Sequence, residues 1–464
     1  MNSVNSLQDR HNQGILKRFA APLLIALPVA GLLFWSVPLA LKVWTENSNS
    51  GVEAAYRYRF ERSPESVTLK LGQEVSFYQE RIRQDPSSGL NRALLAKTYL
   101  RMARATGETS WYLLAEQTAQ DSLVKLPYQN DGAIFALARV ATAKHDFPAA
   151  LKLVQQASQN EETLAVQVTA NLAMGKVDVA KQASDRLAAQ NPDLNSLTLR
   201  ALVGVSQGKD QAAIQDFQQA LAAEEPEEIG SSVWARTALG RLYFKRGELD
   251  QAGKLYQEAL RILPNYPPAL LNSAELAIRR GKYQVAEDLY ARFFQISKNS
   301  PTVYDHVIYR GMARVKQLEG DSASATQWRN EAEARLRQDL TTFGHRRELA
   351  RLLLEKGRPQ DVTEALTLMQ AEVKVRRDAE TMDTLAFAFA QLGRWQEAQQ
   401  AMQAVLHSGI RDPALFYRAG TIEQALGRSP QATAFFKAAQ ETDPKFDDQA
   451  RQALGLGVGL LGLN

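Results

Sequence analysis

The stretch that decides the fold is SSVWARTALGRLYFKRGELDQAGKLYQEALRILP (231–264), followed directly by NYPPALLNSAELAIRRGKYQVAEDLYARFFQISK (265–298). Both lines repeat one pattern of small and aromatic residues, in which Gly247 corresponds to Gly281, 34 positions later. Small residues allow two helices to approach closely, and glycine suits a left-handed turn between them. Pro264 cannot continue the second helix because its nitrogen carries no hydrogen. The stretch therefore predicts two consecutive helix-turn-helix units.

The repeated positions resemble those of the tetratricopeptide repeat (TPR) family. The residues that carry the resemblance are Leu239, Gly240, Tyr243, Gly247, Ala252, Tyr256, Ala259 and Pro264 in the first copy, and Ala274, Ala277, Gly281, Ala286, Tyr290 and Phe293 in the second. Since one helix pair cannot bury its own apolar face, the pattern predicts a stack of pairs. The resemblance implies that this stack follows a right-handed superhelix.

The same spacing of turn residues and alanines continues along the chain. Ala96 and Tyr99 pair with Ala115 in a first unit, and the turns of the others fall at His145, Gly175, Gly208, Gly247, Gly281, Gly320, Gly357, Gly393 and Gly427. No segment shows the alternating pattern of a strand. We therefore predict an all-α solenoid of about ten TPR-like units, preceded by one transmembrane helix.

The composition divides the chain into six segments. They are a polar N-terminal tail (1–18), a transmembrane anchor (19–44), a flexible spacer (45–63), an N-terminal capping helix (64–86), the solenoid (87–450) and an apolar Gly/Leu tail (451–464). Ser63 and Pro64 are a typical helix start, and apolar residues then recur every three or four positions. This lone helix is expected to cap the stack.

A long uncharged run suggests the membrane anchor. The run from Phe19 to Leu41 contains no charged side chain, and as a helix it would span about 35 Å, enough for a bilayer. The alternative is a cleaved secretory signal, but the run is long and no Ala-x-Ala site follows it. Lys17 and Arg18 stand closest to the run, whereas Lys42 is followed by acidic residues. We therefore expect a single-pass membrane protein with a cytoplasmic N-terminus and periplasmic or lumenal repeats.

The composition also argues against several kinds of site. The 55 basic and 51 acidic residues give a net charge of +4, which is typical of a mixed solvated surface, so no nucleic-acid partner is expected. The absence of cysteine excludes disulfides and cysteine nucleophiles. Five histidines are scattered without metal-binding spacing, namely His11, His145, His306, His345 and His407. We expect no metal, no cofactor and no catalytic residue.

In the TPR family the first helix of each pair lines a concave groove, so the resemblance places particular residues there. We call this set the predicted ladder, and its members are Arg241, Phe244, Lys245, Arg279, Arg310, Arg314, Arg347 and Arg351. Arginine binds carboxylates bidentately, so the ladder predicts an acidic segment or a C-terminal carboxylate as ligand. Alternatively, these are ordinary exposed arginines, and Glu275 and Glu355 on the same faces weaken the positive field.

The resulting hypothesis is a membrane-anchored scaffold, attached through residues 19–44, that binds partner proteins in its groove. By family analogy it would assist the assembly or stability of a membrane complex. One alternative is a structural protein that self-associates into homo-oligomers. The other is an enzyme whose site the sequence does not reveal.

Overall fold

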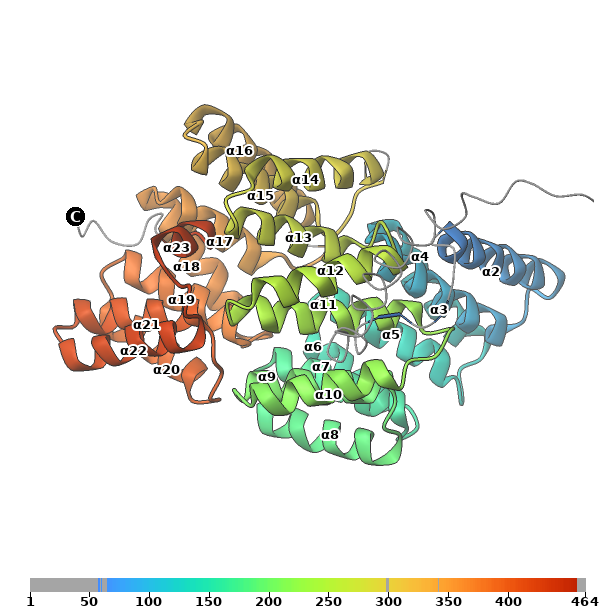
Figure 1. Ribbon diagram of the computed structural model, residues 1–464. Coiled ribbons are helices and arrows are strands. Elements are labelled where there is room, and N and C mark those ends of the chain that lie inside the picture. Colours follow the sequence, from blue (N-terminus) through green and yellow to red (C-terminus); the bar gives the residue numbers. More distant parts are fainter. Residues whose placement is uncertain (1–56, 59, 61–64, 298–299, 341, 457–464) are drawn as a thin grey trace, which may run out of the picture. The chain divides into compact units, whose positions relative to one another are not determined.

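The structure, a computed structural model, describes residues 57–58, 60, 65–297, 300–340 and 342–456. Over these residues the chain forms 22 helices and no strand (Figure 1). The helices are α2 (Glu65–Gln84), α3 (Gly89–Thr106), α4 (Thr109–Lys125), α5 (Asp131–Ala143), α6 (Phe147–Val154), α7 (Glu161–Ala173), α8 (Val177–Gln190), α9 (Leu194–Ser206), α10 (Asp210–Ala222), α11 (Ile229–Lys245), α12 (Leu249–Ile262), α13 (Pro267–Arg279), α14 (Tyr283–Ser297), α15 (Asp305–Leu318), α16 (Ser322–Asp339), α17 (Arg346–Lys356), α18 (Pro359–Glu372), α19 (Ala379–Gln391), α20 (Trp395–Leu406), α21 (Pro413–Ala425), α22 (Ser429–Thr442) and α23 (Asp448–Ala453). The prediction of an all-α helical-repeat solenoid is confirmed.

The helices are arranged as successive pairs. From α3 to α22, each odd-numbered helix packs against the even-numbered helix that follows it. Most odd-numbered helices also contact the next odd-numbered one, for example α3 with α5 and α11 with α13. The odd-numbered helices, which we call the inner helices, therefore form one layer.

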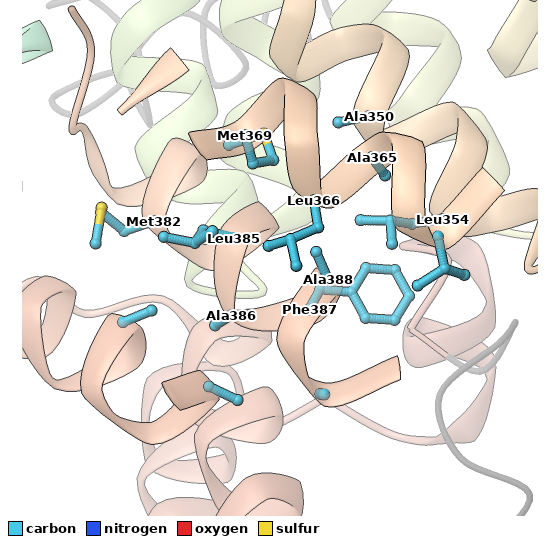
Figure 2. Close-up of a cluster of buried hydrophobic side chains, with 14 of the residues drawn as sticks. Ala350, Leu354, Ala365, Leu366, Met369, Met382, Leu385, Ala386, Phe387 and Ala388 are labelled. Atoms are coloured by element: carbon cyan, nitrogen blue, oxygen red, sulfur yellow. The ribbon is translucent and has the colours of Figure 1, made fainter. Parts of the chain in front are cut away.

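Small residues allow the two helices of a pair to approach closely. A Cβ atom at Gly240 of α11 would lie 2.5 Å from Cε1 of Tyr256 in α12, so only glycine fits there. Figure 2 shows larger side chains filling the spaces between α17, α18 and α19, where Leu354, Leu366 and Phe387 are buried. Burying each such side chain stabilises the fold by about 1.5–3 kcal/mol.

Turns in the early pairs contact segments that precede inner helices six pairs later. The Val303 nitrogen, before α15, donates to Gly107 O in the α3–α4 turn over 3.0 Å. The Arg377 nitrogen, before α19, donates to Ala173 O at the end of α7 over 2.7 Å. His145 Nδ1, in the α5–α6 turn, lies 3.4 Å from Gly344 O, before α17.

We call this set of contacts the seam. The α9–α10 turn continues it, because Gly208 lies against Gly409 before α21. Gly208 has φ of +68°, and a Cβ atom there would lie 2.0 Å from Gly409 O. Both the left-handed backbone and the close approach therefore require glycine at this position. In the α11–α12 turn, Gly247 lies against Asp443 in the same way.

The structure contradicts the single-pass membrane localisation. Of the helices in the described ranges, none is both long and apolar enough to cross a bilayer. The longest of them, α2, carries Lys70, Glu74 and Arg81, because its surface is divided between a buried face and a solvated one. The N-terminal tail (1–18) and the expected anchor (19–44) lie outside the described residues. The expected cytoplasmic N-terminus and periplasmic or lumenal repeats are withdrawn with the membrane localisation.

Candidate functional site

Inner helices line several hollows in the described part of the chain, and two of these hollows differ clearly in size and in charge. The first, which we call the open groove, has a volume of about 530 Å³. Its lining comes mainly from α3, α5, α7, α9, α11 and α13, and comprises Arg104, Arg139, Thr142, Ala165, Val166, Thr169, Asn195, Leu199, Trp234, Thr237, Ala238, Arg241, Tyr266, Pro268, Asn272 and Tyr304. This set contains three arginines and no carboxylate.

Arg104 is the arginine of the open groove with the most unusual surroundings. Its guanidinium lies 5.2 Å from the centre of the Trp234 ring and close enough to Tyr266 for the two groups to interact electrostatically. Burial lowers the pKa of Arg104, and the positive charge of Arg139 lowers it further. Among the described residues, no carboxylate forms an ion pair with Arg104, whereas Arg139 pairs with Glu162 at 3.1 Å.

The second hollow, which we call the inner cavity, is smaller, at about 130 Å³. Its charged lining residues are Arg241, Lys245, Arg279, Arg351 and Arg418 together with Glu275, Glu355, Glu380, Asp383, Asp412 and Asp443. Two of the pairs join early and late helices across the seam, Lys245 with Asp412 at 2.6 Å and Arg279 with Asp443 at 3.1 Å. The cavity is therefore close to electrical balance.

Most of the predicted ladder lies at or near this cavity, and every one of its basic residues is paired. Arg310 and Arg314 share Glu355, at 2.6 and 3.3 Å. Burial alone would raise the pKa of Glu355, but the two arginines lower it to about 2. The remaining pairs join Arg241 to Glu275, Arg347 to Glu348, Asp378 and Glu380, and Arg351 to Glu380.

Only Arg241 of the predicted ladder also lines the open groove. Phe244 was expected to face the ligand, but it is 4% exposed and lies beneath the Arg241 guanidinium. Most of the carboxylates that pair with these basic residues lie in other repeat units than the basic residues themselves. Whether these eight residues bind a ligand stays a prediction.

Three of the five histidines are not scattered in space. His145 and His306 lie on either side of His345, with ring centres 5.8 and 4.6 Å from it. Burial lowers the pKa of His145 to about 4, and the pKa values of His306 and His345 shift in the same direction for the same reason. In the part of the chain that the structure describes, no cluster of metal-ligating side chains could hold an ion. These histidines belong to the seam and line neither hollow.

Sequence reasoning missed Arg104, Arg139 and Trp234. A signal for Trp234 was present, because it precedes Thr237 by three positions and Arg241 by seven, which places all three on one helical face. Arg104 offered no such signal, since its neighbours in the groove come from α11 and from the segments before α13 and α15.

Comparisons with known proteins place repeats in three parts of this chain. Family profiles described as tetratricopeptide repeat match residues 166–228 and 384–445, and a second such profile matches residues 233–276. Human tetratricopeptide repeat protein 7B is 28% identical over 88 residues, which is 19% of this chain and 10% of that protein. The chain thus matches about a tenth of that relative's length.

Two solved structures are similar at lower identity. A tetratricopeptide repeat protein from Parabacteroides merdae is 17% identical, with a TM-score of 0.36, over 57% of this chain and 98% of that one. The APC/C hetero-tetramer Cut9–Hcn1 is 13% identical, with a TM-score of 0.33, over 89% of this chain and 98% of that one. At these TM-scores neither structure supports a conclusion about function.

Proposed function

Because this chain contains tetratricopeptide repeats, we propose that it is a protein-interaction scaffold whose open groove binds an extended, acidic segment of a partner protein. The observation that carries the proposal is the lining of the groove, which contains three arginines and no carboxylate. Arg139 and Arg241 pair with Glu162 and Glu275, which lie outside this lining. Arg104 forms no ion pair with a carboxylate among the described residues. A basic surface favours an acidic partner because complementary charge speeds association and rejects partners of like charge.

The shape and composition of the groove support the same ligand class. Its lining extends over six inner helices, so a peptide in extended conformation can contact several of them at once. Arg104, Trp234 and Tyr266 are of the residue types that contribute most to protein–protein binding energy. We assign no catalytic role to the chain. The buried histidines form part of the contacts of the seam.

The proposed binding site therefore does not include most residues of the predicted ladder. A ligand at Arg310 or Arg347 would have to replace carboxylates that already pair with them, and it would gain little in exchange. Arg241 keeps its place in the proposal because it lines both hollows.

Site-specific photo-crosslinking in cells tests this proposal and captures the partner whatever its identity. A photo-reactive residue is placed at Thr169, in the groove, or at Thr326, which is exposed on the outer helix α16. We expect discrete adducts with another protein from position 169 and none from position 326. Adducts from position 326 alone would contradict the proposal. Adducts at position 169 with a second copy of this chain would replace it with self-association.

A further inference from the structure

One end of the open groove is built by parts of the chain that are far apart in sequence. Arg104 of α3 lies over Trp234 of α11, and α3 and α11 are in direct contact. Tyr304, from the segment before α15, reaches the same place, because a Cβ atom at Gly107 would lie 2.8 Å from its ring. This convergence depends on the seam, and consecutive helix pairs alone would not produce it.

On the side of the open groove, aromatic side chains and a second arginine surround Arg104, whereas Glu227 and Glu228 line a separate hollow that Arg104 also borders. The ring of Trp234 covers one face of the guanidinium, and the hydroxyl groups of Tyr266 and Tyr112 lie close enough to interact with its charge. Arg139, on the neighbouring inner helix α5, adds a second positive charge. Arg139 pairs with the partly exposed Glu162, an interaction that is worth little in solvent. An anion that contacts both guanidinium groups would reduce the repulsion between them.

Arg104 differs in this respect from the basic residues of the inner cavity. Lys245, Arg279 and Arg310 each lie within 3.1 Å of a carboxylate oxygen. For Arg104, no described carboxylate fills that role. A guanidinium with free donors beside aromatic rings suits a planar carboxylate, which it can bind through two parallel hydrogen bonds.

We propose that Arg104 and Arg139 bind one carboxylate of the partner segment, while Trp234 and Tyr304 pack against the residue next to it. This proposal rests on the proposed function and specifies the anchor point of the ligand. The carboxylate belongs either to an Asp or Glu side chain or to the C-terminus of the partner, and both sources present the same planar group.

The first experiment is a selection of random 12-residue peptides on the full chain. One library is displayed with free C-termini, and the other is displayed through its C-termini, so that only side-chain carboxylates are available. We expect Asp or Glu beside an apolar residue to be enriched in the second library if the source is a side chain. Enrichment in the first library alone would identify a C-terminal carboxylate.

The second experiment measures coupling between the anchor and the selected peptide. In fluorescence anisotropy, Arg104→Gln and Arg139→Gln should each weaken binding roughly 10- to 100-fold. Replacing the peptide's carboxylate with an amide should cost as much, and combining it with Arg104→Gln should cost little more, because both changes remove one interaction. Arg337→Gln, on the outer helix α16 where Arg337 pairs with Glu364, is the matched control and should not change binding.

The outcomes separate this inference from the scaffold function. Arg139 is exposed, so Arg139→Gln should fold normally and give a reading even if Arg104→Gln does not. Additive losses, or binding that persists after every carboxylate of the selected peptide is replaced with an amide, would overturn the carboxylate anchor while leaving the scaffold intact. Failure of both the peptide selection and the crosslinking at Thr169 would overturn the scaffold itself.

Discussion

The open groove and the inner cavity are built from the same layer of inner helices. Every basic side chain that lines the cavity has a carboxylate partner, whereas Arg104 in the groove pairs with no carboxylate of the described residues. In the cavity, late helices face early ones across the seam and supply carboxylates such as Asp412 to cations such as Lys245. In the open groove, the late part of the chain contributes Tyr304 and no acidic group. A basic stripe on a repeat protein therefore indicates a ligand site only where the fold has not already neutralised it.

The strongest way to test this contrast is to remove a cavity carboxylate. Glu355→Gln leaves Arg310 and Arg314 close together and largely buried without their shared acid. We expect it to destabilise the protein by about 3–5 kcal/mol, because breaking a buried pair leaves charge uncompensated. Thermal unfolding monitored by circular dichroism measures the loss. The control is Glu397→Gln, which removes an exposed partner of Arg394 on α20 and should leave the unfolding midpoint unchanged.

A second test weakens the seam, across which ion pairs of the inner cavity form. Gly208→Ala places a Cβ against Gly409 O in a left-handed turn, whereas Gly393→Ala places one in a left-handed turn with open space around it. We expect a loss of about 2–4 kcal/mol at Gly208 and about 1 kcal/mol at Gly393. Hydrogen exchange of the amides in residues 205–215 and 405–415 would report the local opening. Equal losses at the two positions would mean that the seam contributes nothing to stability.

Acidification should weaken the seam through its histidines. The pKa of His145 is about 4 in the folded protein because burial disfavours its charged form, against an ordinary value of 6.5. The folded-state pKa is the lower one, so stability is lost as the pH falls from about 6.5 toward about 4, and His145 alone should cost about 2 kcal/mol by pH 5. Thermal midpoints at pH 7.5 and pH 5.0 measure this effect.

His145→Asn is the matched variant for the pH experiment. Asparagine tolerates the left-handed conformation of this residue, whose φ is +60°, but it does not titrate. The variant should lose less stability than the wild type between the two pH values. An unchanged loss would assign the acid sensitivity to other groups.

The smallest expected effect on stability lies in the groove itself. Arg139→Gln removes an exposed ion pair with Glu162 and should change the free energy of unfolding by less than about 0.5 kcal/mol. The affinity for an acidic peptide should nevertheless fall. A substitution in the open groove would then weaken binding without a loss of stability, whereas a substitution in the inner cavity lowers stability. A large loss of stability in this variant would contradict the contrast between the two hollows.

The local spacing of residues was sufficient to predict the helix pairs. Gly240 lies opposite Tyr256, and Gly281 forms a left-handed turn. Both features depend on neighbours within one repeat, so both could be predicted from the sequence. The histidines show where such reasoning stops. His145 and His345 lie 200 positions apart, and no spacing rule relates them, yet their rings are 5.8 Å apart.

The amino-acid order alone establishes that this chain is a stack of helix pairs, because helix periodicity, turn residues and small-residue packing all act over fewer than about 40 positions. Only the folded chain determines which helix pairs contact the pairs that follow six units later in the sequence. That meeting depends on the sum of many small rotations between neighbouring pairs, and a change of a few degrees in each would bring different residues together. The same sum places Asp412 beside Lys245, whereas it leaves Arg104 beside Trp234 in the open groove.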